Sequence, residues 1–179
     1  MRTPSPQARS FPRVQSRNLP AGDAGASITL RKMQVLVNQS LTDPVVINTA
    51  KSIIRFLPER NYPMFVDAIR EFLSQRVLFC KDPRGVELLH TPRYMLDTIA
   101  RRFYLQADCD DAAILAAALG KALGLRARFV ALGFSVPRAP LSHVYTEIGL
   151  PSGEWIPLDT TKAPYADPPA VSRVKRVEV

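Results

Sequence analysis

Cys109 stands where a chain can supply a reactive thiol, because an alanine-rich run at residues 112–124 follows it closely. This run is strongly helical, and its small side chains predict a central helix that neighbours approach closely. Backbone N–H groups at a helix start have no partner within the helix, and the helix dipole is positive there. Both features favour a thiolate and help the main chain to stabilise an oxyanion beside the sulfur. Cys109 is therefore a candidate nucleophile.

A thiol at a helix start needs a base, and the chain has two histidines, His90 and His143. His143 lies in a segment with the alternation of a β-strand, and Asp159 ends the strand-like segment that follows a tight turn. A hairpin would bring His143 and Asp159 to neighbouring strands, where the carboxylate fixes the tautomer and angle of the imidazole. The helix that carries Cys109 would pack on this sheet. The sequence thus predicts a nucleophile, a base and an orienting acid.

Acidic residues surround the candidate nucleophile. Asp108, Asp110 and Asp111 would oppose ionisation of the thiol, and acids in a first turn commonly cap the helix or pair with its dipole. Each triad residue also has a structural alternative: a buried apolar cysteine, a hydrogen-bonded strand histidine or a turn-forming aspartate. Their order along the chain and their local settings together favour the catalytic interpretation.

The remaining segments predict helices first and antiparallel strands afterwards, which is an α+β order. A first helix is expected from Ser27. Capping side chains followed by proline mark three more helix starts, at residues 42–44, 61–63 and 91–92. The apolar run of the third helix continues through residues 77–80. Strand-like segments occupy residues 125–134, 141–150 and 154–161.

The composition indicates one ordinary globular domain. The chain has 179 residues, of which 46% are hydrophobic and 22% charged, enough for one core but tight for two. We expect an extended basic Pro-rich arm at residues 1–22, a domain at 23–165 and a C-terminal tail or strand at 166–179. Two cysteines make no disulfide framework, and no stretch reaches the roughly 20 apolar residues of a membrane span. A reducing cytoplasm is the default compartment.

The formal charge of +8 belongs mainly to the two ends of the chain. Residues 1–22 hold four arginines and no acid, and residues 173–179 hold three basic residues and one acid. Basic arms can contact nucleic acid, a membrane surface or an acidic protein. Phe11 is the sole aromatic residue of the N-terminal arm, so a stacking surface is missing and a nucleic-acid partner is disfavoured.

Three blocks around the candidate triad resemble the transglutaminase-like superfamily, which is related to papain-like cysteine proteases. The nucleophile helix of that family and the strand after it are similar to ADCDDAAILAAALGKALGLRARFV, its histidine strand to SHVYTEI, and its aspartate strand to GEWIPLDTT. The resemblance implies a papain-like core in which Cys109 is the nucleophile, His143 the base and Asp159 the orienting acid. The family usually has glycine where this chain has Ala107, and a left-handed backbone there would strain an alanine.

Supporting residues are also expected near this triad. Gln106 is a candidate to stabilise the oxyanion, Asp110 is a candidate supporting side chain, and Trp155 is expected to pack beside the triad and shield it. His90 is expected at the surface or capping a helix, and Cys80 in the core. The spacing of the cysteines and histidines resembles no paired-ligand motif, so no metal and no organic cofactor are implied.

A further segment, KDPRGVELLHTPRYMLDTIA, is similar to a subgroup found mostly in tailed bacteriophages and prophages. The expected function is cysteine-dependent acyl transfer, or amide or peptide hydrolysis, on a protein or peptide substrate. The alternative is a phage virion protein, a head–tail or tail-assembly component that uses the fold without catalysis. Such a protein would contact other phage structural proteins through its N-terminal arm. Both hypotheses place the chain in the host bacterial cytoplasm, and the second also in the virion.

Overall fold

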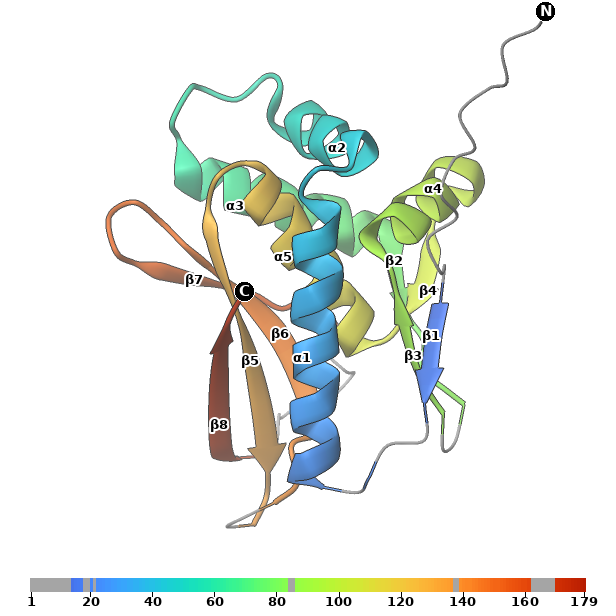
Figure 1. Cartoon of the computed structure of the whole chain (residues 1–179). Coiled ribbons are helices and arrows are strands. Elements are labelled where there is room, and N and C mark those ends of the chain that lie inside the picture. Colours follow the sequence, from blue (N-terminus) through green and yellow to red (C-terminus); the bar gives the residue numbers. More distant parts are fainter. Residues whose placement is uncertain (1–13, 18–19, 21, 84–85, 137–138, 162–169) are drawn as a thin grey trace, which may run out of the picture.

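The helices of the chain gather around one central helix, and a four-stranded sheet packs against that helix as well (Figure 1). A computed structural model describes residues 14–17, 20, 22–83, 86–136, 139–161 and 170–179. The elements in chain order are β1 (Val14–Arg17), α1 (Asp23–Ser40), α2 (Pro44–Ile54), α3 (Tyr62–Arg76), β2 (Val77–Phe79), β3 (Glu87–His90), α4 (Pro92–Arg102), β4 (Leu105–Ala107), α5 (Cys109–Ala122), β5 (Arg126–Phe134), β6 (His143–Gly149), β7 (Trp155–Leu158) and β8 (Val171–Glu178).

Side-chain caps begin α2, α3 and α4 where the sequence predicts them. Asp43 Oδ1 accepts from the N–H of Val45 at 2.8 Å, and Thr91 Oγ1 accepts from the N–H of Tyr94 at 3.2 Å. Asn61 caps α3 in the same way. A proline lies in the first turn of each of these helices, where its missing N–H has no helical acceptor to lose. The predicted starts of these three helices are confirmed.

The large sheet is antiparallel, in the order β7-β6-β5-β8, and this confirms the predicted α+β fold with an antiparallel sheet. Directly paired residues share a face of the sheet. On the face toward the helices, Phe129 pairs with Thr146 and Ala131 pairs with Val144, and all four are buried. The Thr146 hydroxyl donates to the carbonyl of Ala113 at 2.8 Å, so that β6 is tied directly to α5.

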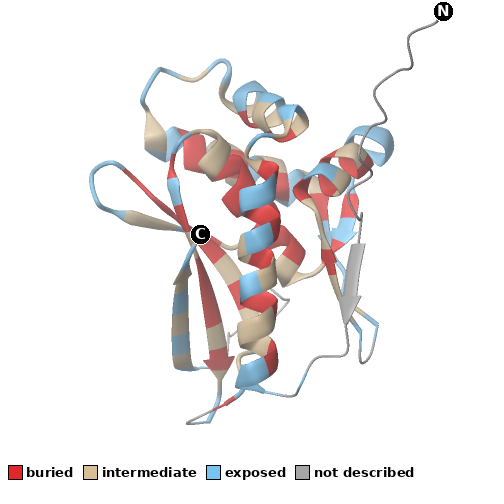
Figure 2. Cartoon of the chain, in the orientation of Figure 1, coloured by how far each residue is buried: buried red, intermediate tan, exposed pale blue. Residues whose placement is uncertain are grey.

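The central helix α5 forms the middle of the core because its small side chains let neighbours approach closely. Residues 112–120 are all buried (Figure 2). Gly120 faces Ile148 of β6, and a Cβ atom there would lie 2.5 Å from Ile148 Cδ1. This close approach explains a glycine inside a helix, where it costs about 1 kcal/mol relative to alanine. The packing of α5 on β6 fixes the direction in which the helix start points.

Four short strands are not predicted by the sequence. Residues 77–80 do not extend α3, because the chain leaves the helix at Val77 and forms β2, which pairs in parallel with β4. β1 pairs with β3 in the antiparallel sense. Strands this short show too few residues for alternation to be recognised, and their partners lie far away in sequence. Helix α1 also begins earlier than expected, at Asp23 rather than Ser27.

Described parts of both ends of the chain lie against the domain. Most of the arm expected at residues 1–22 lies outside the described residues, but β1 within it pairs with β3. Strand β8 pairs with β5 along its length, so the sheet continues past the domain boundary expected at residue 165. Residues 162–169, which link β7 to β8, lie outside the described part of the chain.

Candidate active site

Cys109 is the first residue of α5, and its sulfur lies against the start of β6. Asp108 caps the helix, since its Oδ1 accepts from the N–H groups of Asp110 and Asp111 at 3.1 and 3.3 Å. The backbone N–H groups of Val144 and of Cys109 itself approach the sulfur and favour its ionised form. The sulfur therefore lies beside the strand that carries the candidate base.

His143 and Asp159 form a hydrogen-bonded pair between neighbouring strands. His143 Nε2 lies 2.8 Å from Asp159 Oδ2. The backbone N–H and the hydroxyl of Thr161 both donate to Asp159 Oδ1, each at 3.1 Å. Burial acts to raise the pKa of Asp159, but the hydrogen bond and charge of His143 and the two donors of Thr161 outweigh it, so the pKa lies below its usual value. Asp159 is therefore an ionised acceptor at neutral pH.

This pair also fixes the protonation pattern of a neutral His143 ring. A carboxylate can only accept, so Nε2 must carry the proton that joins it to Asp159. Nδ1 is then the unprotonated nitrogen, and its lone pair is available to take a proton from a thiol. The imidazole and the carboxylate thus have the relation of a general base to its orienting acid.

One cavity of about 1010 Å³ adjoins all three residues of the predicted triad. Cys109, His143 and Asp159 line it together with parts of α1, β5 and the β2–β3 connection. The Cys109 sulfur makes its hydrogen bond to Asp110 Oδ1, at 3.8 Å, and not to His143. The lining combines carboxyl groups with apolar side chains, namely Asp82, Glu87, Asp108 and Asp110 with Leu30, Phe79, Leu132, Phe134, Leu141 and Val171.

The carboxyl groups near the sulfur have too little solvent and too few donors to keep their ordinary pKa values. Burial chiefly raises the pKa of Asp108 to about 7, and the charges of Asp111 and Asp82 add to this effect. Burial also raises the pKa of Asp110 well above its usual value. Burial, and then the charges of Asp110 and Asp108, raise the pKa of the Cys109 thiol. The cysteine therefore rests as a thiol at neutral pH.

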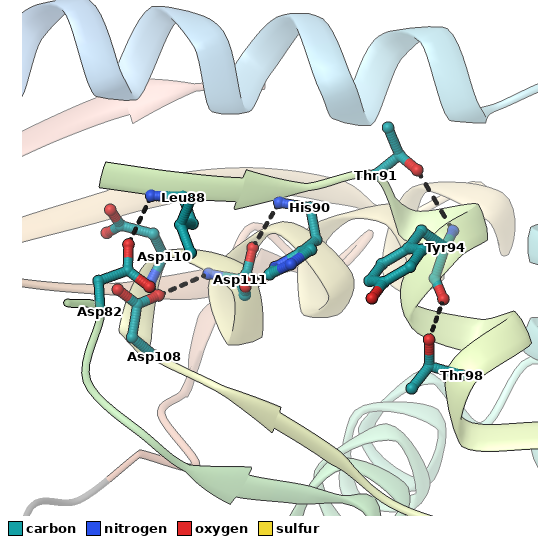
Figure 3. A network of polar contacts seen from close by, with 9 residues as sticks. All are labelled: Asp82, Leu88, His90, Thr91, Tyr94, Thr98, Asp108, Asp110 and Asp111. Atoms are coloured by element: carbon teal, nitrogen blue, oxygen red, sulfur yellow. Dashed lines mark hydrogen bonds and ion pairs between the residues drawn. The ribbon is translucent and has the colours of Figure 1, made fainter. Parts of the chain in front are cut away.

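A second histidine–aspartate pair lies next to the site, and the sequence does not predict it. Asp111 Oδ1 accepts from the backbone N–H of His90 at 2.8 Å, and Oδ2 lies 2.5 Å from His90 Nδ1 (Figure 3). The His90 ring stacks on Tyr94 with the centroids 5.0 Å apart. Burial acts to lower the pKa of His90, but Asp111 raises it overall. His90 thus ties β3 to the start of α5. In the sequence, the only feature that points to this residue is that the chain has two histidines.

Two of the expected supporting residues lie away from the cavity. Gln106 is an exposed residue of β4 outside the cavity lining. Trp155 pairs with Gly149, at the opposite end of β6 from His143 and about 20 Å along the strand. Its ring packs under the guanidinium of Arg128, at 4.0 Å. Of the three supporting candidates, the structure brings Asp110 alone to the cavity.

The backbone before Cys109 is unstrained. Ala107 is the last residue of β4 and pairs with Phe79, and it is not among the described non-glycine residues with positive φ. Glycine is therefore not required at this position. Cys80, expected in the core, is instead exposed, because it follows the end of β2, where Leu78 and Phe79 are exposed as well.

Comparison with known proteins agrees with this architecture. The model of the transglutaminase-like superfamily matches residues 64–160, more than half of the chain, and the chain belongs to this superfamily. A solved structure of a "putative protease" from Parabacteroides distasonis has 16% sequence identity and a TM-score of 0.56, over 84% of this chain and 28% of that one. A "putative cysteine protease" from Cytophaga hutchinsonii has 19% identity and a TM-score of 0.46, over 75% of this chain and 50% of that one.

The match to the Parabacteroides distasonis structure concerns the fold alone, and this chain spans half or less of the length of either protein. A comparison with curated proteins finds no match. Within the described ranges, no helix combines the length and the apolar composition that a membrane crossing requires.

Proposed function

We propose that this protein performs cysteine-dependent acyl transfer, or amide or peptide hydrolysis, with Cys109 as nucleophile, His143 as base and Asp159 as orienting acid. The observation that carries the proposal is the His143–Asp159 pair, which leaves Nδ1 unprotonated on a ring that lines the same cavity as Cys109. Membership of the transglutaminase-like superfamily supports it. The substrate class that fits is a carboxamide or peptide carbonyl of a protein or peptide.

The first step forms a thioester. The Cys109 sulfur turns from Asp110 toward the ring, its proton passes to His143 Nδ1, and the sulfur attacks the substrate carbonyl. Backbone N–H groups near the sulfur stabilise the oxyanion. The N–H group of Cys109 is available for this, because Asp108 accepts from the N–H groups of Asp110 and Asp111 but not from that of Cys109. His143 then gives its proton to the leaving amine.

The second step releases the acyl group. Water attacks the thioester in a hydrolase, or an amine attacks it in a transamidase, and His143 takes the proton of the attacking group. The thiol is regenerated when that proton returns to sulfur. Because the resting group is a thiol with a raised pKa, proton transfer to His143 accompanies the attack rather than preceding it.

The test compares Cys109→Ala with Cys80→Ala, since these are the two cysteines of the chain. Three assays cover the outcomes: cleavage of an unstructured protein, ammonia release from a glutamine peptide, and incorporation of a fluorescent primary amine. We expect Cys109→Ala to lose the activity that the native protein shows and Cys80→Ala to keep it. Equal activity of Cys109→Ala and the native protein would remove the enzymatic proposal.

A second candidate function is a phage structural role, as a head–tail or tail component that keeps the fold without catalysis. The carboxyl groups that oppose thiolate formation at Cys109 favour it. In this case the partners are other phage structural proteins, and the location is the host cytoplasm and the virion. The test introduces Cys109→Ala into the genome that encodes the chain and counts complete particles. Normal assembly, with no thiol-dependent turnover by the native protein, supports this role, whereas loss of particles on loss of the thiol contradicts it.

A further inference from the structure

Among the described residues, the imidazole of His143 has two aromatic neighbours. Tyr145 lies two residues along the same strand, with ring centroids 6.2 Å apart and an angle of 27° between the planes. Phe134, on neighbouring β5, lies at 6.4 Å with an angle of 33°. Both separations fall within the range of favourable ring pairs. Residues two apart share one face of a strand, so the backbone itself sets the Tyr145 ring beside the base.

Tyr145 is held in turn by a buried carboxylate. Its hydroxyl donates to Glu147 Oε1 at 3.4 Å, and Glu147 is only 7% exposed. Arg128 of β5 donates to Glu147 Oε2 at 2.6 Å, and Arg176 of β8 lies 3.7 Å from the same oxygen. Burial and the Glu147 charge raise the pKa of Tyr145, so the hydroxyl stays a donor. Side chains from three strands therefore fix the place of this ring.

A single hydrogen bond does not fix the plane of an imidazole. The second side-chain torsion of histidine has broad minima, and the bond between Nε2 and Asp159 leaves rotation about its own axis. Ring contacts on the imidazole restrict that rotation. Of the two contacts, that of Tyr145 is the one locked by further hydrogen bonds and ion pairs.

We propose that Tyr145 is a positioning residue for His143: its ring, locked through Glu147, holds the imidazole so that Nε2 meets Asp159 while Nδ1 stays free for the thiol. The consequence for catalysis rests on the proposed triad, whereas the effect of Tyr145 on the orientation of the His143 ring does not. Strand β8 thereby acts on the site, because Arg176 helps to fix Glu147.

The test measures the tautomer of His143 by ¹⁵N NMR, with His90→Gln to assign the signals of the two histidines. Tyr145→Leu removes the ring, Tyr145→Phe keeps it without the hydroxyl, and Tyr62→Leu is the matched control, because Tyr62 has its own aromatic partner at 5.7 Å and lies outside the cavity lining. We expect one tautomer with the proton on Nε2 in the native protein, in Tyr145→Phe and in Tyr62→Leu, and a mixture of both tautomers in Tyr145→Leu.

Turnover supplies the second readout. A misplacement of about 1 Å can lower a rate by about 100-fold, so Tyr145→Leu should lower kcat by about 10- to 100-fold with KM nearly unchanged. If Tyr145→Leu does not fold, Tyr145→Ile replaces it, since a β-branched residue suits a strand. A single tautomer and native kcat in the folded variant would overturn the proposal, as would the same tautomer mixture in Tyr62→Leu. If the native protein shows no turnover, the proposed function fails while the tautomer comparison still decides this inference.

Discussion

The candidate site has a sheet half, formed by His143, Asp159 and Thr161, and a helix half, formed by Asp108 and Cys109 at the start of α5. Both halves bury ionisable groups, but the pKa values of these groups shift in opposite directions. On the sheet half, the carboxylate of Asp159 accepts from His143 and twice from Thr161, and its pKa is lowered despite burial. On the helix half, Asp108 has two backbone donors, but burial and then its acidic neighbours raise its pKa to about 7. The pKa of Cys109 is raised in the same surroundings.

This difference shows that the partners of a buried group, and not burial alone, decide its charge. Donors from His143 and Thr161 keep Asp159 ionised, so in the proposed mechanism the base is oriented before substrate arrives. Burial, and then the neighbouring carboxyl groups, raise the pKa of Cys109, so in the proposed mechanism the nucleophile stays protonated until the base takes its proton. If the proposed triad is correct, the sheet half is pre-organised and the helix half is activated during the reaction.

The largest expected effect comes from Asp159→Asn on the sheet half. An amide can present N–H to the imidazole and stabilise the wrong tautomer, which removes the lone pair at Nδ1. A corresponding change in a serine protease triad lowers kcat by about 10⁴-fold, and we expect about 10³- to 10⁴-fold here. Steady-state kinetics with the most active assay measure it. The matched control Asp97→Asn alters an exposed pair with Arg93 and should leave kcat unchanged.

A loss below about 10-fold in folded Asp159→Asn would mean that the pair does not orient the base, and the contrast between the halves would then have no catalytic meaning.

The second prediction concerns stability and the helix half. The pKa of Asp108 is about 7 in the folded protein against its ordinary value of 3.8, so the folded state holds a proton that the unfolded chain releases. This contribution is complete below pH 3.8 and is lost as pH rises through 7. The free energy of unfolding should therefore fall by about 3 kcal/mol between pH 5 and 8. Urea unfolding at several pH values measures it.

Asp108→Asn should flatten this pH dependence, because asparagine caps a helix equally well but does not titrate. Asp110, Asp82 and His90 act in the same direction, since their raised pKa values give stability that is lost as pH rises, so some slope remains. Asp159, with its lowered pKa, acts only below pH 3.8. An unchanged slope in Asp108→Asn would show that this carboxyl is not the source.

The sequence carries the local features of the site and little of its surroundings. Cys109 at a helix start, and His143 and Asp159 across a short turn, have signals within a few residues, and the structure brings the three to one cavity. Their chemistry stays a prediction. The pair of Asp111 with His90 joins positions that are 21 residues apart in the sequence. His90 ends the four-residue strand β3, and Asp111 follows the three-residue strand β4, so no local sequence pattern reveals the pair.

The two displaced support candidates show why position along an element matters. Trp155 and Asp159 are four residues apart, so alternation gives them one face but about 13 Å of strand separates them. Gln106 is close to Cys109 in sequence, yet the β4 backbone leaves its side chain exposed. Closeness in sequence to Asp159 or Cys109 therefore does not predict whether either side chain reaches the site, because the direction of a strand residue depends on which strand it pairs with.

The third prediction tests the like charges around the nucleophile. At the alkaline pH where the thiol ionises, Asp110 is charged and repels the thiolate, so Asp110→Asn should lower the thiol pKa. In a Cys80→Ala background, alkylation by iodoacetamide below that pKa should become about 10-fold faster. Asp67→Asn, at an exposed residue, is the control. If the rate does not change, burial alone governs the thiol, and the charge part of the contrast is wrong.

An effect no larger than the third is expected from Thr161→Val, which removes one of the two donors that Thr161 gives to Asp159 and keeps the backbone N–H. Thr161 is 4% exposed, and valine has a similar shape, so the fold should persist. A hydrogen bond to a charged group contributes about 1.5 kcal/mol or more, which predicts a loss of about 10-fold in kcat, while Thr161→Ser should stay near the native rate. If serine and valine are equally impaired, the packing of the methyl group and not the hydroxyl matters. The orienting acid would then depend on His143 and a backbone donor, which makes the sheet half less prepared than its hydrogen bonds indicate.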